Sequence, residues 1–186
     1  MTEQRRDVLL AAATDYALSA GLVGLSLRPV AAAIGTSDRM LIYHFGTRDA
    51  LVSAITTESC RRAVAAVDAL AGAKTVRAGV KDLWAAYQSP SLAPLLTLYC
   101  QAAATGLIGR EPYRSDVRAA NALWSAALGQ YLTRCGAGPQ RARRIVTLVD
   151  SSLYGFFLDL VTDRPDELAR GVNDLADAAH ALASTH

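Results

Sequence analysis

Apolar residues recur every three or four positions along almost the whole of this 186-residue chain, and no segment alternates apolar and polar residues. The first spacing is typical of a helix with one buried face, and the second, which is missing, is typical of a half-buried strand. Alanine and leucine outnumber valine, isoleucine and threonine, which also favours helix over sheet. The sequence therefore predicts an all-α fold.

Glycine and proline residues divide the chain into nine predicted helices. Glycine ends a helix readily because it adopts positive φ, and proline is tolerated in a first turn, where its missing N–H removes no intrahelical bond. Side chains that can cap a helix start precede several of these helices, among them Ser26, Ser37 and Thr47. The predicted ranges are 5–20, 27–34, 38–44, 48–70, 74–88, 91–108, 112–134, 139–162 and 165–183.

Composition excludes several classes of protein. With 52% hydrophobic and 19% charged residues the chain is not disordered, and a net charge of +2 gives no argument for a polybasic binder. The widely spaced Cys60, Cys100 and Cys135 exclude a disulfide framework and an obvious zinc site, and we expect no metal or other cofactor. We find no signal peptide, and prolines interrupt the uncharged stretch 83–109, so we expect no membrane span and a cytoplasmic location.

Residues 26–45 carry the pattern that points most directly to a function. Two short predicted helices are separated by Gly35-Thr36-Ser37, which is the spacing of a helix-turn-helix. Packing of their apolar side chains against the first helix would leave a short polar and aromatic face free to meet DNA. We expect the packing positions to be Val30, Ile34, Leu41 and Phe45, against Val8, Ala12 and Tyr16 of the first helix.

The segment from Arg5 to Leu51 resembles the DNA-binding part of the TetR family of bacterial transcriptional repressors. The residues that carry the resemblance include Gly21, Ser26, Val30-Ala31, Gly35, Ser37 and the run Tyr43-His44-Phe45-Gly46-Thr47-Arg48-Asp49-Ala50-Leu51. Chain length and helix number also fit the family. The resemblance implies a non-enzymatic DNA-binding transcriptional regulator, with repression as the usual mode. It also implies a helix-turn-helix domain at 1–46 and a ligand-binding and dimerisation domain at 47–186.

By this resemblance, Ser37, Arg39, Met40 and Tyr43 would face the major groove, joined by Arg28. An arginine can pair with a guanine edge, and a methionine or tyrosine can contact a thymine methyl group. The family places phosphate contacts at His44, Thr47 and Arg48. Asp38 either accepts from a cytosine amino group or only stabilises the helix start.

The segment departs from the family's pattern at three positions. Ile42 stands where the family often has an aromatic residue against phosphate, so that contact is lost. Arg39 and Met40 stand where many relatives have small residues, so the operator is not predicted by analogy.

The resemblance further implies a homodimer formed through 139–162 and 165–183, binding double-stranded DNA at a palindromic operator. A small apolar or amphipathic effector would release the DNA. Asp150 lies in an otherwise uncharged stretch, where a buried carboxylate needs a partner or a cationic ligand. We expect instead that Asp150 accepts a hydrogen bond across the dimer seam or faces water. The candidate pocket residues are Trp84, Tyr87, Tyr99, Trp124, Tyr131, Asp150, Tyr154 and Phe157.

Three alternatives remain open at this point. An enzyme would need a nucleophile elbow, a metal motif or paired carboxylates, and the sequence has none of these patterns. A thiol-based redox regulator would use Cys60, Cys100 or Cys135, although small buried cysteines explain all three more simply. A TetR-like protein without an effector would bind DNA for an architectural or division purpose.

Overall fold

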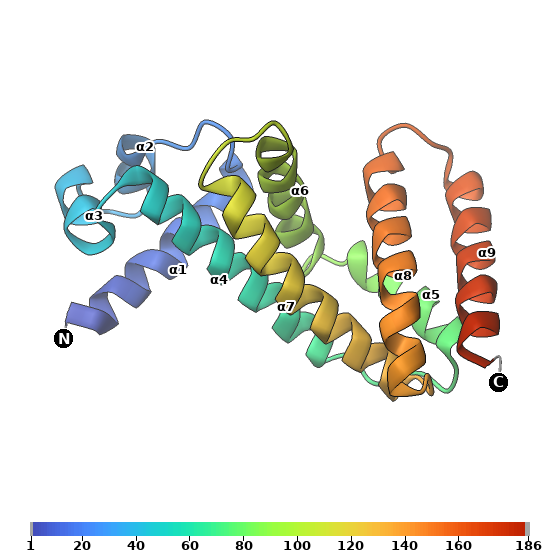
Figure 1. Cartoon of the computed structure of the whole chain (residues 1–186). Helices are drawn as coiled ribbons and strands as arrows, with labels where there is room; N and C mark the ends of the chain where they lie inside the picture. Colours follow the sequence, from blue (N-terminus) through green and yellow to red (C-terminus); the bar gives the residue numbers. More distant parts are fainter. Residues whose placement is uncertain (1, 185–186) are drawn as a thin grey trace. The chain divides into compact units, whose positions relative to one another are not determined.

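The computed structural model describes residues 2–184, and these residues form nine α-helices and no strand (Figure 1). The predicted all-α fold is confirmed. The largest boundary differences lie at the start of the first helix, predicted at Arg5 and observed at Thr2, and at the end of the eighth, predicted at Thr162 and observed at Asp159. The helices are α1 (Thr2–Ala20), α2 (Leu27–Ala33), α3 (Asp38–Phe45), α4 (Arg48–Asp68), α5 (Val76–Tyr87), α6 (Ala93–Leu107), α7 (Tyr113–Arg134), α8 (Pro139–Asp159) and α9 (Pro165–Ser184).

Two compact units make up the described residues. The first comprises the chain up to Ala63 together with Pro94–Ala122, and the second comprises Val64–Ala93 and the residues from Leu123 onward. Helices α4 and α7 each contribute to both units, because the divisions fall inside them. The predicted DNA-binding domain at 1–46 lies wholly in the first unit, which also contains most of α6.

Helix α1 packs with a face that is shifted by one residue from the predicted face. Leu9, Ala13 and Ala17 are buried in the core of the first unit, whereas Val8 is 57% exposed. Each residue advances a helix by about 100°, so a pattern read one position early predicts the neighbouring face. The expected packing of Val8 is therefore wrong, and Ala12 is only partly buried. Leu41 and Phe45 of α3 and Val30 of α2 do enter this core, with Ile34 and Tyr16 partly buried at its edge.

Local hydrogen bonds fix the helix-turn-helix. Gly35 has φ +67°, and this left-handed conformation lets the Thr36 N–H donate to the Ala31 carbonyl at 2.9 Å, which ends α2. The Ser37 hydroxyl then accepts from the Met40 N–H at 3.3 Å and caps α3. Ser26 occupies the cap position of α2, but its side chain forms no cap hydrogen bond, contrary to expectation.

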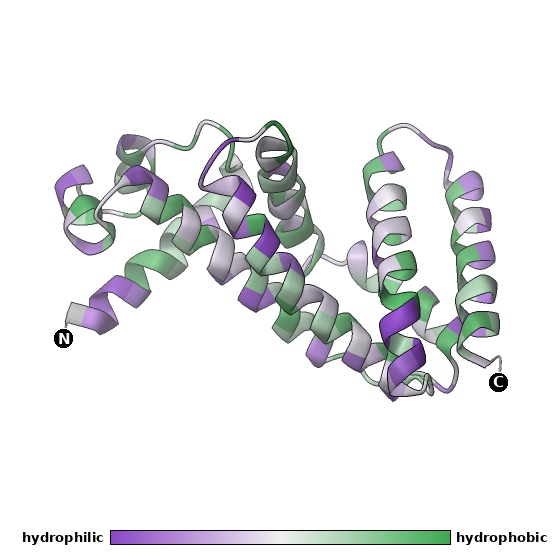
Figure 2. Ribbon diagram, in the orientation of Figure 1, coloured by the Kyte–Doolittle hydropathy of each residue, from purple (hydrophilic) through white to green (hydrophobic). Residues whose placement is uncertain are grey.

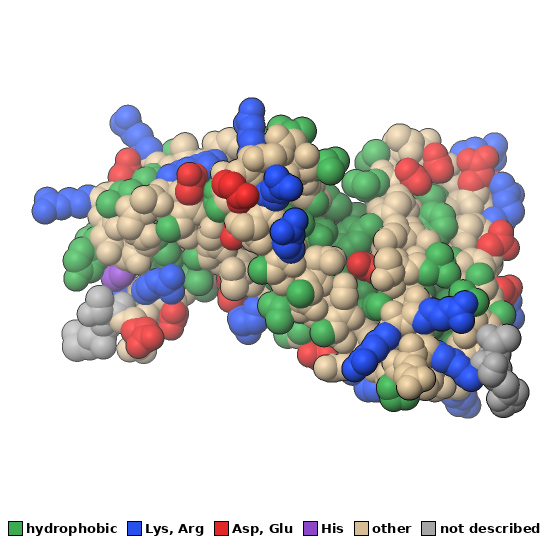
Figure 3. Space-filling view, in the orientation of Figure 1, with side chains coloured by type: hydrophobic (Ala, Val, Ile, Leu, Met, Phe, Trp, Pro, Cys, Tyr) green, Lys and Arg blue, Asp and Glu red, His purple; other side chains and the backbone are tan. Residues whose placement is uncertain are grey.

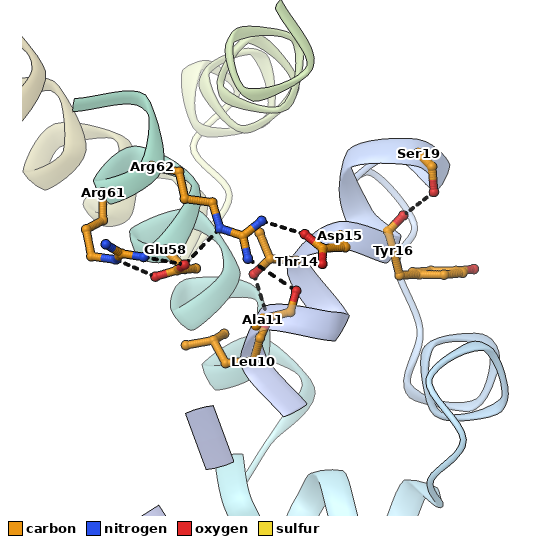
Figure 4. A network of polar contacts seen from close by, with 9 residues as sticks. All are labelled: Leu10, Ala11, Thr14, Asp15, Tyr16, Ser19, Glu58, Arg61 and Arg62. Atoms are coloured by element: carbon orange, nitrogen blue, oxygen red, sulfur yellow. Dashed lines mark hydrogen bonds and ion pairs between the residues drawn. The ribbon is translucent and has the colours of Figure 1, made fainter. Parts of the chain in front are cut away.

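A polar network joins α1 to α4 within the first unit (Figure 4). The Arg62 guanidinium donates to Asp15 on α1 and to Glu58 one turn back on α4, at N–O distances of 2.5 and 2.8 Å. Arg61 also donates to Glu58, through two nitrogens. The hydrogen bonds from Arg61 and Arg62 hold the pKa of the Glu58 carboxyl at about 2. The network thus fixes the helix that follows the helix-turn-helix against α1.

The second unit is built around α9, which packs against α5 and α8. Hydrophilic and hydrophobic patches follow one another along α9 in Figure 2, as expected for a helix with one packed face. Its inner residues include Val172, Ala176 and Ala179, all buried. Gly171 allows close packing on α8, because a Cβ there would lie 2.8 Å from the Phe156 ring. None of the helices in the described part of the chain is long and apolar enough to span a membrane.

Candidate nucleic-acid interface

Helix α3 is anchored on one side and open on the other. Leu41 and Phe45 are buried, with 0% and 8% of their surface exposed, whereas Tyr43 is 70% exposed. A tyrosine this exposed on an ordered helix leaves an aromatic ring and a hydroxyl available to a partner. The other exposed α3 positions are Asp38, Arg39, Met40 and Ile42, with Ser37 exposed at the cap.

Basic side chains flank this face. Arg28 on α2 and Arg39 on α3 are exposed, and neither takes part in an ion pair among the described residues. Figure 3 shows basic side chains extending outward over α2 and α3. Arg6 of α1, which the sequence analysis did not single out, lies with its guanidinium carbon 5.0 Å from the Phe45 ring centroid. Exposed guanidinium groups without carboxylate partners can pair with phosphates or guanine edges.

His44 lies in the last turn of α3, at the end of the exposed face. Its ring meets that of Tyr43 edge to face, with centroids 5.0 Å apart. Its Nε2 is buried and forms no hydrogen bond within the described residues. A buried polar nitrogen without a partner is costly, so a group that hydrogen-bonds to it would be stabilised there.

Thr47 and Arg48 hold the start of α4. The Thr47 hydroxyl accepts from the Ala50 N–H at 3.0 Å, which is the predicted cap. The Arg48 guanidinium donates to the Leu25 carbonyl at 2.9 Å, to Asp49 at 2.8 Å and to the Tyr113 hydroxyl at 3.2 Å. The hydrogen bond to Asp49 contributes most to raising the pKa of Arg48. Most donors of this predicted phosphate ligand are thus used inside the first unit.

Long-range contacts tie the helix-turn-helix to α6 and α7. The Gln101 side-chain oxygen on α6 accepts from the Leu22 N–H at 2.7 Å, just before α2. The Ser53 hydroxyl on α4 donates to Asp116 on α7 at 2.8 Å. Together with the hydrogen bond from Arg48 to Tyr113, these contacts connect α6 and α7 to the segments on both sides of α2 and α3.

Four of the candidate pocket aromatics gather in the second unit. The Tyr87 ring centroid lies 5.6 Å from that of Tyr154, 6.1 Å from that of Trp124 and 6.3 Å from that of Phe157. The Trp84 ring centroid lies 6.2 Å from that of Phe156, which was not predicted, in a separate pair. Tyr131 lies elsewhere in this unit and donates to the Gly79 carbonyl at 3.4 Å. Tyr99 belongs to the first unit.

Asp150 lies within this aromatic cluster. Its Oδ1 accepts from the Trp124 indole N–H at 2.8 Å and from the Tyr87 hydroxyl at 3.3 Å, and only 8% of the residue is exposed. The expectation that Asp150 faces water is wrong, since two aromatic side chains of its own chain cover it. Burial raises the pKa of this carboxyl, and the hydrogen bonds from Trp124 and Tyr87 oppose the rise. Both donors are neutral, so the pair leaves the buried negative charge uncompensated.

The three cysteines are poorly suited to redox signalling. Burial raises the pKa of Cys60, and it raises that of Cys100 to about 11, so both remain protonated thiols near neutral pH. Cys135 is buried, and its Sγ accepts from the Ala73 N–H at 3.4 Å. Among residues 2–184 no group of three or more histidine, cysteine, aspartate or glutamate side chains is placed to hold a metal ion.

Comparison with models of protein families gives no match. Comparison with curated protein sequences gives none either. Solved structures do match over almost the full chain. One, described as a TetR-family transcriptional regulator from Rhodococcus sp., is 19% identical with a TM-score of 0.73, covering 98% of this chain and 100% of that one.

Two further matches are structures with bound ligands. The multidrug binding protein EbrR complexed with proflavin is 24% identical, with a TM-score of 0.68, and the alignment covers 93% of this chain and 98% of that one. A single-residue variant of TetR from Acinetobacter baumannii AYE, in complex with minocycline, is 19% identical, with a TM-score of 0.57 and coverage of 95% and 97%. The chain therefore has the fold of the TetR-family transcriptional regulators, as the helix-turn-helix sequence implied.

Proposed function

We propose that the protein is a DNA-binding transcriptional regulator whose exposed α3 face enters the major groove of double-stranded DNA. The observation that carries the proposal is the contrast on α3 between buried Leu41 and Phe45 and the open side with Tyr43 and Arg39. A helix held rigidly on one side can present the other to base edges at defined positions. The shared fold supports the same function.

Each exposed residue of this face other than Ile42 has a role in this proposal. Arg39 and Arg28 pair with guanine edges, while Met40 and the Tyr43 ring contact thymine methyl groups. Ser37 and Asp38 lie at the start of α3. The Ser37 side chain caps the helix, and the negative charge of Asp38 interacts favourably with the helix dipole.

A separate group of residues contacts the phosphates. We assign His44 and Thr47, at the junction of α3 and α4, to phosphates; because the Nε2 of His44 is buried, its contact requires the imidazole ring to turn towards the surface. We assign Arg48 chiefly to positioning, since its hydrogen bonds hold α4 to Leu25 and Tyr113.

We further propose that two copies bind a palindromic operator as a homodimer through α8 and α9, and act as a repressor. One short helix reads too few base pairs for useful specificity, and two-fold symmetry doubles the contact. Exposed apolar side chains on and just after α8 supply surface for such a contact. They are Leu148, Leu158, Leu160 and Val161, with 40%, 57%, 40% and 89% of their surface exposed.

We also propose that a small amphipathic effector regulates DNA binding from the second unit. The aromatic cluster around Asp150 supplies rings and one buried carboxylate, a combination that suits a planar ligand with a cationic group. EbrR in complex with proflavin and the Acinetobacter TetR variant in complex with minocycline share the fold, which supports regulation by a small molecule. An effector that binds better to a second arrangement of the dimer would lower the DNA-competent fraction.

The function is tested with a duplex selected by the protein from a random pool. Fluorescence anisotropy with this duplex compares the wild type with Arg39→Ala and with Lys81→Ala, a control that removes an exposed cation from α5. We expect Arg39→Ala to lose about 1–3 kcal/mol of binding free energy and preference at one base step. Equal affinity and preference in Arg39→Ala and the wild type would refute the assignment.

A further inference from the structure

A groove lies between α6 and α7 in the first unit, and Tyr99 is the one residue of its lining that the sequence predicted in an effector pocket. Its volume is about 590 Å³, within the range of small-molecule sites. From α6 it is lined by Tyr99, Ala103 and Leu107, and from α7 by Arg114, Arg118 and Asn121. One wall is thus largely apolar and the other is basic.

The two arginines of this groove form no ion pair. Arg114 and Arg118 are four residues apart and exposed, and none of the ion pairs among the described residues includes them. Glu111, just before α7, accepts hydrogen bonds from the Ser115 N–H and hydroxyl, at 3.1 and 2.8 Å, and these bonds, together with the nearby charges of Arg114 and Arg118, lower the pKa of Glu111. Like charges at this spacing destabilise a helix, and an anion between them would relieve the repulsion.

The apolar wall is unusually open. Leu107 is 89% exposed and Ile108, in the turn after it, is 69% exposed. Figure 3 shows hydrophobic side chains at the α6–α7 turn beside a row of basic side chains over the start of α7. A surface that combines exposed apolar side chains with unpaired guanidinium groups is complementary to a ligand with an apolar body and an anionic end.

The floor of the groove is held by close backbone packing. A Cβ on Gly106 would lie 3.0 Å from the Arg114 Cα and 3.1 Å from its nitrogen, so the two helices approach closely where the chain turns. The spacing of the two helices that form the groove is therefore fixed at this end by backbone contact.

The geometry points to a binding site for an amphipathic carboxylate, such as a fatty acid, with the carboxylate on Arg114 and Arg118 and the chain along Tyr99, Ala103 and Leu107. Hydrogen bonds also connect the helices of this site to the segments around α3. Tyr113, next to Arg114, accepts from Arg48, and Gln101, on the same helix as Tyr99 and Ala103, accepts from the Leu22 N–H. A ligand that moves α6 or α7 would change the hydrogen bonds that hold the helix-turn-helix. This regulatory consequence rests on the proposed function, whereas the binding itself does not.

The binding is tested with full-length protein and no DNA. Isothermal titration calorimetry uses sodium dodecanoate below its critical micelle concentration, with dodecyltrimethylammonium chloride as the probe of equal chain length and opposite charge. The variant Arg114→Gln/Arg118→Gln is compared with Lys74→Gln/Lys81→Gln, which removes two exposed cations from the second unit. Circular dichroism verifies that both variants keep the helical content of the wild type.

We expect the wild type and the lysine variant to bind one dodecanoate per chain, and the arginine variant to bind at least about tenfold more weakly. The cationic probe should bind none of the three proteins at this site. Equal dodecanoate affinity in all three proteins, preference for the cationic probe, or no binding by the wild type would overturn the proposal. If the wild type does not bind dodecanoate and the arginine variant changes its oligomeric state, the groove is a protein interface, which also overturns the proposal.

A second titration separates the site from its proposed consequence. Anisotropy with the selected duplex is repeated with dodecanoate present. We expect the DNA affinity of the wild type to change and that of the arginine variant to stay constant. Failure of all DNA binding would contradict the proposed function alone and leave the calorimetric result standing.

Discussion

The Arg48 guanidinium and the Tyr113 hydroxyl are 3.2 Å apart, and this hydrogen bond joins the first turn of α4 to the first residue of α7. Tyr113 is 5% exposed, and the same guanidinium also donates to the Leu25 carbonyl, just before α2. One side chain thus links three segments that surround the helix-turn-helix. Arg48 therefore orients α3 through its neighbours.

Tyr113→Phe tests this positioning role. The change removes only the hydroxyl, so we expect a stability loss of about 1 kcal/mol together with weaker binding of the selected duplex. Thermal unfolding and anisotropy measure the two effects. Ser115→Ala, two residues further along α7, is the control and should leave DNA binding unchanged. If Tyr113→Phe alters neither stability nor affinity while Arg48→Ala weakens binding alone, Arg48 is a phosphate ligand only.

Glu58, whose hydrogen bonds from Arg61 and Arg62 lie within α4, predicts an acid-sensitive polar network on this helix. Its pKa is about 2 in the folded protein, against an ordinary value of 4.5, chiefly because of the hydrogen bond from Arg61. A lowered carboxyl pKa stabilises the fold above the unfolded pKa, and that stability is lost as pH falls from about 4.5 towards 2.

We expect Glu58→Gln to lose roughly 1–2 kcal/mol at pH 7, after allowance for solvent screening, and to match the wild type near pH 2. Urea unfolding at a series of pH values measures the difference. A constant difference across that range would show that packing, and not the charge of Glu58, is responsible.

Gly106→Ala tests the close approach of α6 and α7. The added methyl group would meet the backbone of Arg114 at 3.0 Å, and backbone cannot move aside as a side-chain tip can. We expect a loss of about 1–3 kcal/mol, as for other overpacked sites. Gly129→Ala is the matched control, since a Cβ there has nothing within 4 Å, and it should stabilise α7 by about 0.5–1 kcal/mol. Equal effects of the two changes would exclude a steric cause.

Asp150→Asn tests whether the buried carboxylate costs stability. Burial raises the pKa of this acid, so its contribution to stability is largest below the unfolded pKa and declines as pH rises through the folded pKa. Asparagine keeps the volume and an oxygen acceptor for Trp124 and Tyr87, but it cannot ionise.

We therefore expect Asp150→Asn to melt at the same temperature as the wild type near pH 4 and at the same or a higher temperature near pH 8. The exposed, ion-paired Asp177 offers the control Asp177→Asn. A large loss of stability near pH 8 would contradict this reasoning and indicate that the ionised carboxylate is stabilised in the folded protein.

The helices could be predicted from sequence because their signals are local. The Ser37 and Thr47 caps and the glycine turn at Gly35 each depend on residues a few positions apart. Contacts between distant residues left no such signal. Tyr113 lies 65 residues from Arg48 and Gln101 lies 79 residues from Leu22, and nothing in either residue type specifies the partner.

Two expectations failed for related reasons. Val8 and Leu9 are both apolar, so periodicity alone did not determine which of two adjacent faces α1 buries. The environment of Asp150 depends on donors from α5 and α7, which a pattern within α8 does not contain.

Selection of DNA from a random duplex pool with the full-length protein at low ionic strength, together with the mass of the protein in solution, tests whether α3 reads DNA from a symmetric pair. We expect a dimer that enriches an inverted repeat whose half-sites are centred about 34 Å apart or a multiple of it. A monomer that enriches no sequence would contradict this expectation.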